Sequence, residues 1–155
     1  MNIYLVQHGK SKSKEDDPQR PLTDKGRSET VKAASFAARH ALFNINCIIH
    51  SGKARAEQTA QIMAEYLKPA EGVKEDSGLA PNDNPYIWAE RLSETSGDVM
   101  LVGHLPHLAR LASWLLCQNL ELNTVSFRNS CIVCLTRDEF GNWSVAWMVV
   151  PQMLP

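Results

Sequence analysis

The chain has 155 residues, which is enough for one ordinary domain with its own core. Lys plus Arg number 16 and Asp plus Glu number 17, so the net charge is −1 and no basic balance points to nucleic acid or to an anionic membrane. Hydrophobic residues make up 44% and charged residues 21%, with 8 Gly and 8 Pro, which excludes a disordered or fibrous chain.

The first residues lack the pattern of a secretory signal. The segment MNIYLV leads directly to Gln7 and His8, with neither a basic leader nor a long apolar stretch. No later segment approaches the roughly 20 apolar residues that a membrane-spanning helix needs. We therefore expect one domain over residues 1–155, located in the cytoplasm and without a membrane partner.

Four cysteines lie mostly in apolar runs, and a chain of this length does not need disulfides. Two of them, Cys131 and Cys134, have the C-x-x-C spacing that can bind zinc or carry redox chemistry. Their segment CIVCLT is strand-like, however, and residues three apart in a strand point to opposite faces. Without a second Cys pair or a His cluster, the sequence predicts no metal site. All four cysteines are expected to be reduced core residues: Cys47, Cys117, Cys131 and Cys134.

The first half of the chain alternates strand-like and helix-like segments. Residues Asn2 to Val6 form a short apolar strand, and Cys47 to Ile49 form a second one. Thr23 has the properties of a helix N-cap, and the helix after it runs to about Leu42. A second helix begins near Ala54 and ends before Pro69. The predicted buried positions are Val31, Ala34, Ala38 and Leu42 in the first helix, and Ala56, Thr59, Ala60, Met63 and Leu67 in the second.

The stretch from Pro69 to Gly97 is rich in loop-forming residues, and we expect in it a short strand near Val73 and a helix through Trp88 to Leu92. A strand from Asp98 to Val102 follows. The spacing of the next apolar residues predicts a helix marked by Leu108, Leu111, Ala112 and Leu115.

The chain ends in two strand-like segments, Cys131 to Thr136 and Trp143 to Val149, joined by the turn DEFGN. This pattern predicts a terminal hairpin. Together with the alternation of strands and helices before it, the hairpin indicates a single α/β domain.

Polar residues follow three of the predicted strands. His8 comes after the first strand, Arg55 lies in the segment after the second, and His104 follows the strand that ends at Val102. In open α/β sheets the ligand lies at the carboxyl ends of the strands. Two histidines and one arginine can therefore converge in one crevice.

These residues belong to four ordered motifs that resemble the histidine phosphatase superfamily, also called the phosphoglycerate mutase-like fold. The motifs are LVQHG at Leu5 to Gly9, PLTDKG at Pro21 to Gly26, RAEQTA at Arg55 to Ala60 and GHLP at Gly103 to Pro106. The resemblance covers essentially the whole chain and is to the small branch of SixA-like phosphohistidine phosphatases. It implies a three-layer α/β/α domain with a mostly parallel sheet.

The resemblance implies a metal-independent phosphatase without a cofactor, in which a histidine attacks phosphorus and forms a phosphohistidine enzyme that water hydrolyses. His8 matches the nucleophile, and Arg55 and His104 match the donors to the phosphoryl oxygens. The attacking nitrogen must be unprotonated, and a backbone carbonyl that holds the other N–H would fix that tautomer. The expected substrate-binding residues around this centre are Gln7, Gly9, Lys10, Ser11 and Thr23.

One departure from the family is Gln7, which replaces an arginine. A charge-assisted hydrogen bond is worth about 1.5–3 kcal/mol against about 1 for a neutral one, so phosphoryl binding should be weaker. Lys10 stands where the small branch often has an acid, so Gln7 and Lys10 together carry +1 where arginine plus acid carry zero. We hypothesise that Lys10 or a neighbour supplies part of the missing charge; the alternative is a solvated basic loop.

A second departure concerns the proton donor to the leaving group. Larger members that act on sugar phosphates have an acid in an insertion between the arginine helix and the second histidine. The corresponding segment here is short, and none of its acids lies in a recognisable version of that motif. Cleaving a P–N bond to an imidazole needs less acid help than expelling an alkoxide, which favours phosphohistidine. The acids in question are Glu71, Glu75, Asp76, Asp83 and Glu90.

The three remaining histidines match no catalytic position. His40 lies at a helix end and His50 precedes a turn, so structural or solvated roles are expected for both. His107 forms H-x-x-H with His104, but further metal ligands are missing, and we expect it at the rim of the site.

Three functions therefore follow from the sequence. The leading one is a phosphatase of protein phosphohistidine that forms phospho-His8, with a phosphotransfer domain as the kind of partner expected. The second is a phosphatase of small phosphomonoesters, favoured if an acid between Glu71 and Glu90 faces His8. The third is a phosphate- or phosphoprotein-binding module without turnover because of Gln7.

Overall fold

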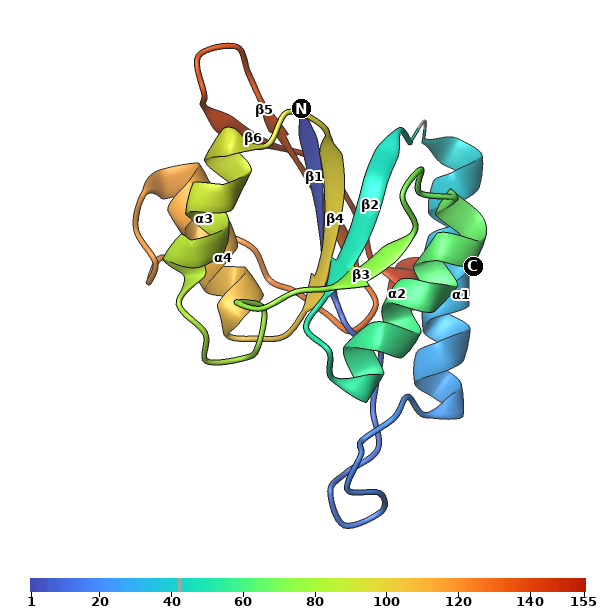
Figure 1. Cartoon of the computed structure of the whole chain (residues 1–155). Helices are drawn as coiled ribbons and strands as arrows, with labels where there is room; N and C mark the ends of the chain where they lie inside the picture. The colour runs from blue at the N-terminus through green and yellow to red at the C-terminus, as the bar shows by residue number, and fades with distance from the viewer. Residues whose placement is uncertain (42) are drawn as a thin grey trace.

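The computed structural model describes residues 1–41 and 43–155. They form one six-stranded mixed sheet in the order β3-β2-β4-β1-β5-β6 (Figure 1). The strands β3, β2, β4 and β1 are parallel to one another, β5 is antiparallel to β1, and β6 is antiparallel to β5. No helix in this described part is long and apolar enough to cross a membrane. The strands are β1 (Asn2–Gln7), β2 (Ile45–His50), β3 (Val73–Glu75), β4 (Asp98–Gly103), β5 (Ile132–Arg137) and β6 (Trp143–Val149).

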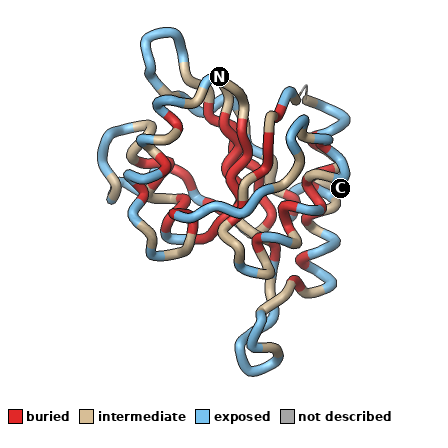
Figure 2. Tube along the Cα trace, viewed as in Figure 1, coloured by how far each residue is buried: buried red, intermediate tan, exposed pale blue. Residues whose placement is uncertain are grey.

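Helices cover both faces of the sheet. The pair α1 (Asp24–His40) and α2 (Ala54–Leu67) packs on one face, and the pair α3 (Pro85–Glu94) and α4 (His107–Cys117) on the other (Figure 1). The alternation along β1 divides the core accordingly, because neighbouring strand residues point to opposite faces. Ile3 and Leu5 join the α3/α4 core, whereas Tyr4 and Val6 join the α1/α2 core. Figure 2 shows the resulting buried centre of the sheet.

The predicted order of elements is confirmed, with a short 3-10 helix, η1 (Pro151–Met153), as an addition. Thr23 caps α1, since its side chain accepts a hydrogen bond from the Gly26 N–H. The α/β class and the C-terminal β5–β6 hairpin are likewise confirmed. The predicted buried positions of α2 are all buried.

The predicted face of α1 is wrong in part. Ala34 is buried, but Val31 is only half-buried and Ala38 is exposed, while Leu42 lies outside the described residues. Small side chains form the buried face because they allow α1 to approach α2 and the sheet closely. An estimate from hydrophobicity favours Val31 over Gly26 and Thr30, which do not look apolar. The buried residues of α1 are Gly26, Thr30, Ala33, Ala34 and Ala37.

The cysteines are free, and three of the four are buried. Cys131 lies in the α3/α4 core and Cys134 in the α1/α2 core, so the two thiols are on opposite faces as predicted from the strand. Cys117 corrects the expectation of a core residue: it ends α4 and is exposed. As the last residue of an amphipathic helix, Cys117 lies on the face that is exposed to solvent.

Candidate active site

The site is built at the carboxyl ends of three neighbouring parallel strands. β4 lies between β1 and β2, so the residues that follow these strands come out along the same edge of the sheet. His8 follows β1, and its backbone N–H donates to the carbonyl of Gly103 at 3.0 Å. His104 follows Gly103, and the two imidazole rings have centroids 4.9 Å apart. The structure thus brings together the two predicted histidines.

The protonation state of His8 is set by its surroundings. Its Nδ1 lies 2.7 Å from the carbonyl oxygen of Gly9. Because a carbonyl only accepts, Nδ1 carries the proton and Nε2 is the unprotonated nitrogen. Burial, together with the positive charges of Arg55 and Arg20, lowers the His8 pKa to about 4. At neutral pH His8 is therefore an uncharged imidazole with a free lone pair on Nε2.

His104 is held by a residue whose role the sequence analysis missed. Its Nε2 lies 2.6 Å from the Ser51 hydroxyl, which belongs to the loop after β2. The ring is 1% exposed, and its Nδ1 has no hydrogen-bond partner within the described residues. Burial, together with His8 and Arg55, lowers the His104 pKa to about 3. A serine directly after the strand-end His50 gave no signal in the sequence that would have linked it to His104.

Arg55 brings a half-buried positive charge to the same edge. It stands in the first turn of α2, where the helix dipole adds positive potential. Its Nε is buried without a hydrogen-bond partner in residues 1–41 and 43–155, and no ion pair found there engages it. Burial, followed by the charge of Arg20, lowers the Arg55 pKa. A partly buried guanidinium with an unused donor suits an anion.

A backbone frame fixes the loop that carries His8. Gly9 donates its N–H to the Thr59 hydroxyl at 3.0 Å, and this hydroxyl donates to the Arg55 carbonyl at 2.7 Å. On the opposite side, the Asn129 amide donates to the His8 carbonyl at 2.9 Å. The loop that carries His8 is therefore tied to α2 and to the segment before β5. The sequence analysis predicted Thr59 as a buried helix residue and gave it no role at the site.

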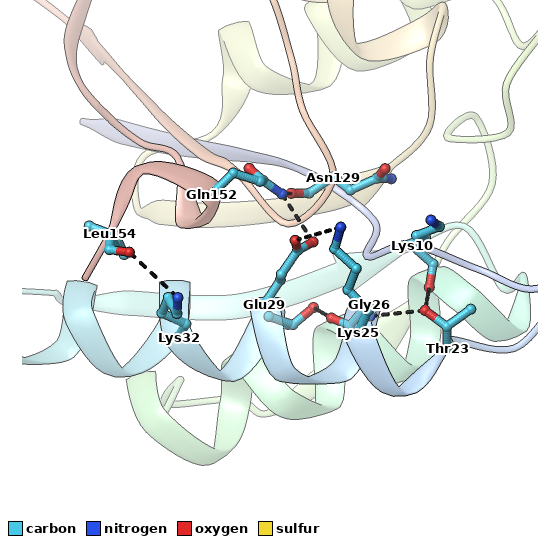
Figure 3. A network of polar contacts seen from close by, with 10 residues as sticks. Lys10, Thr23, Lys25, Gly26, Glu29, Lys32, Asn129, Gln152 and Leu154 are labelled. Atoms are coloured by element: carbon cyan, nitrogen blue, oxygen red, sulfur yellow. Dashed lines mark hydrogen bonds and ion pairs between the residues drawn. The ribbon is translucent and has the colours of Figure 1, made fainter.

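The C-terminal segment continues this frame. The Gln152 amide of η1 donates to the Asn129 carbonyl and to the Glu29 carboxylate of α1, both at 3.0 Å (Figure 3). The chain of contacts therefore runs from α1 through Gln152 and Asn129 to the backbone of His8.

Two glycines let the His8 loop approach α1. A Cβ on Gly9 would lie 2.8 Å from the Thr30 hydroxyl and 2.9 Å from the Gly26 carbonyl, and one on Gly26 would collide with the Lys10 backbone. Both distances are shorter than side chains tolerate. The glycines of the LVQHG and PLTDKG motifs are thus required for packing.

Gln7 and Lys10 lie beside a shallow hollow of about 360 Å³. Gln7 Oε1 is buried and has no hydrogen-bond partner among the residues described. The Lys10 carbonyl accepts from the backbone N–H and the hydroxyl of Thr23 (Figure 3). Thr23 thereby holds the loop onto α1, and a substrate contact of Thr23 or Lys10 stays a prediction.

A second, larger hollow of about 540 Å³ lies beside Arg55. Arg20 lines it and is held in place, since its Nε donates to the Lys12 carbonyl at 3.1 Å and its Nη2 to the Ser11 hydroxyl at 3.3 Å. Ser11 therefore orients Arg20. The sequence analysis missed Arg20, although its position directly before the PLTDKG motif could have drawn attention to it.

The residues of this hollow also show which acid lies near Arg55 and could donate a proton to a leaving group. Asp83 lines it together with Arg55, and Asp83 Oδ2 accepts from the Ala80 N–H at 2.9 Å. No hydrogen bond or ion pair in the described part of the chain joins a carboxylate to His8.

The other histidines have structural surroundings. His50 is buried, and its Nδ1 accepts from the Gly52 N–H at 3.1 Å, whereas His40 is exposed at the end of α1. The expected rim position of His107 is wrong: it is 1% exposed. It begins α4 and turns inward with Leu108, because the first turn of that helix packs against the sheet. The described residues hold no group of three potential ligands that could bind a metal ion.

Comparison with known proteins gives this site a family. The model of the histidine phosphatase superfamily (branch 1) matches residues 3–82, which include His8 and Arg55. The chain belongs to this superfamily. It is a phosphatase of that family, as the resemblance in the motifs predicted. No curated protein sequence matches the chain significantly.

Solved structures show the same fold over nearly the whole length. The protein histidine phosphatase SixA complexed with tungstate has a TM-score of 0.84 at 24% identity, covering 98% of both chains. The putative phosphohistidine phosphatase SixA from Agrobacterium tumefaciens has a TM-score of 0.76 at 23% identity, covering 97% of both. A putative alpha-ribazole-5'-P phosphatase from Escherichia coli K-12 has a TM-score of 0.78 at 14% identity, covering 97% of this chain and 98% of that one.

These likenesses confirm the phosphoglycerate mutase-like fold that the motifs implied. At such identities they show a shared fold, and the substrates named for these proteins differ.

Proposed function

We propose that the protein is a phosphohistidine phosphatase in which His8 is the nucleophile and Arg55 and His104 bind the phosphoryl group. The observation that carries this proposal is the tautomer of His8: Nδ1–H is held by the Gly9 carbonyl, and Nε2 is free at neutral pH. A neutral imidazole is the form that can attack phosphorus.

The reaction has two steps. His8 Nε2 forms a bond to phosphorus as the P–N bond of the substrate breaks, and the departing imidazole takes up a proton from solvent. Water then attacks phosphorus and releases a proton to solvent, the bond to Nε2 breaks with its electron pair returned to His8, and inorganic phosphate leaves. Arg55 and His104 stabilise the charge on the equatorial oxygens in both steps, and burial strengthens these interactions.

Arg20 supports the binding of the phosphoryl group despite the loss of the first family arginine. It lines the hollow beside Arg55 and is held there by Lys12 and Ser11, and its charge lowers the pKa of both His8 and Arg55, which supports this role. Lys10 lines the other hollow, next to Gln7. We therefore assign the compensating charge chiefly to Arg20 and a lesser share to Lys10.

The substrate follows from the position of the acids. An imidazole leaving group does not require a strong proton donor, and among the described residues no carboxylate forms a hydrogen bond or ion pair with His8. The site is also open beside Arg55, where the hollow of about 540 Å³ can receive the surface of a folded protein. A phosphotransfer domain or a similar histidine-phosphorylated carrier in the cytoplasm is the partner we propose.

Asp83 supports a second candidate function. It lines the hollow that Arg55 lines, so a small phosphomonoester bound there could receive its proton. Asp83→Asn separates the two: it should abolish hydrolysis of phosphomonoesters but leave hydrolysis of phosphohistidine within about twofold. If wild-type protein prefers phosphomonoesters and Asp83→Asn removes that activity, the phosphohistidine assignment is wrong.

The primary test uses a carrier protein labelled on its phosphohistidine. Wild-type protein should release phosphate and show acid-labile label on His8, and His8→Ala should do neither. His40→Ala is the matched control, because His40 is an exposed histidine away from the site. Binding of the carrier without release would instead identify a binding module that lacks turnover.

A further inference from the structure

The hollow beside Arg55 is strongly basic, although the chain as a whole is not. Lys14, Arg20, Lys53 and Arg55 line it, against one acid, Asp83. The whole chain has a net charge of −1. Asp83 is engaged by the backbone of its own loop through the Ala80 N–H. Positive charge is therefore gathered locally at this mouth of the site.

In the loop from Ser11 to Arg20, basic and acidic side chains lie in different places. Its sequence contains both signs, but Lys14 and Arg20 line the hollow, whereas the three consecutive acids Glu15, Asp16 and Asp17 do not. The loop extends from the body of the molecule and is exposed along most of its length (Figures 1 and 2). It presents cations to the hollow and directs its acids elsewhere.

Backbone hydrogen bonds keep this loop in shape. The Asp17 N–H donates to the Ser13 carbonyl at 3.0 Å and the Arg20 N–H donates to the Asp17 carbonyl at 2.9 Å. At the two ends of the loop, the Lys12 N–H donates to the Pro21 carbonyl at 2.9 Å. The charge distribution is thus built into an ordered loop, so little conformational entropy is lost when a partner binds.

The hollow is larger than the chemistry requires. Its volume of about 540 Å³ is that of a site for a whole ligand, far more than one phosphoryl group occupies. Within the described chain, neither Lys14 nor Lys53 takes part in an ion pair. Both ammonium groups are available to a further anionic group of the substrate.

We propose that Lys14, together with Lys53 in the same hollow, recognises carboxylates on the surface of the phosphoprotein, next to its phosphohistidine. This inference rests on the proposed function and names the feature that selects the protein substrate. Opposite charges across such a contact speed up association and orient the partner, and the effect weakens as salt screens it.

The test compares Lys14→Glu with wild type on two substrates: free phosphohistidine and a phosphorylated carrier with carboxylates beside its histidine. We expect kcat/KM on the carrier to fall about three- to tenfold at low salt, mainly through KM, and to change less than twofold on free phosphohistidine. Lys68→Glu is the matched control, because it makes the same charge change at the exposed C-terminal end of α2 and Lys68 does not line the hollow.

Two further measurements make the result decisive. A carrier whose neighbouring carboxylate is replaced by lysine should regain part of its rate with Lys14→Glu and lose rate with wild type. Equal losses on both substrates, or no loss on the carrier, would overturn the inference.

Binding separates this inference from the proposed function. In the His8→Ala background, the affinity for the phosphorylated carrier should fall with added salt, and Lys14→Glu should weaken both the affinity and its salt dependence. If wild type binds the carrier in this way without releasing phosphate, the proposed function fails and the docking surface stands. If neither turnover nor salt-dependent binding occurs, both fail.

Discussion

The Nδ1 of His8 lies 2.7 Å from the carbonyl oxygen of its own neighbour, Gly9, so one peptide group sets the tautomer of the proposed nucleophile. Burial keeps Nε2 unprotonated until the pH approaches the His8 pKa of about 4, although the hydrogen bond to Gly9 by itself raises that pKa. We expect the ring nitrogen resonances of His8 to stay those of the Nδ1–H tautomer from pH 8 to pH 5 in nuclear magnetic resonance spectra. A midpoint near 6.5 would contradict this account of the site.

Gln7→Arg should strengthen oxyanion binding, because it would replace a neutral donor by a charged one at the end of β1. We expect the inhibition constant of tungstate to fall about tenfold, which corresponds to about 1.4 kcal/mol. Arg20→Gln should raise it by a similar factor, since Arg20 lines the hollow next to Arg55. If Arg20→Gln leaves tungstate inhibition unchanged, its compensating role is refuted.

Ser51→Ala should reduce turnover without unfolding the protein. The Ser51 hydroxyl is within 2.6 Å of His104 Nε2, and its loss frees the ring to leave its position against His8. We expect kcat on phosphohistidine to fall about tenfold and the free energy of unfolding to drop by about 1 kcal/mol. Ser51→Thr, which keeps the hydroxyl, should recover most of the rate; an equally slow Ser51→Thr would argue against this hydrogen bond.

Asn129→Ala should move the backbone of His8, whose carbonyl accepts from the Asn129 amide at 2.9 Å. We expect a loss of about tenfold in kcat, measured on free phosphohistidine, with KM changed little. Gln152→Ala is one contact further from His8 and should have a weaker effect in the same direction. A larger effect of Gln152→Ala than of Asn129→Ala would show that the C-terminal segment acts by another route.

His107 should make stability depend on pH. Burial lowers its pKa to about 4, so between pH 6.5 and 4 the unfolded chain binds a proton that the folded chain does not. The stability that this histidine contributes is complete above pH 6.5 and declines as the pH falls, by on the order of 2 kcal/mol at pH 5. Urea unfolding at pH 7 and pH 5 should show a smaller decrease for His107→Leu than for wild type. An identical decrease would refute the assignment.

The fold was predictable from local patterns. Periodicity located the strands and helices, the Thr23 cap and the β5–β6 hairpin, because each depends on residues close in sequence. The buried face of α1 was misjudged in part, since its close packing relies on Gly26 and Thr30, which hydrophobicity does not mark. The same limitation concealed His107, whose burial depends on how α4 lies against the sheet.

The sequence by itself determined the family, through four motifs in order, and pointed to His8, Arg55 and His104 as strand-end or helix-start residues. The tertiary structure decided the rest, because hydrogen bonds and electric fields act between residues that are distant in the chain. Ser51 meets His104 across 53 positions, and Asn129 meets His8 across 121. The gathering of Lys14 and Arg20 beside Arg55 likewise exists only when the loop after β1 folds back toward the start of α2.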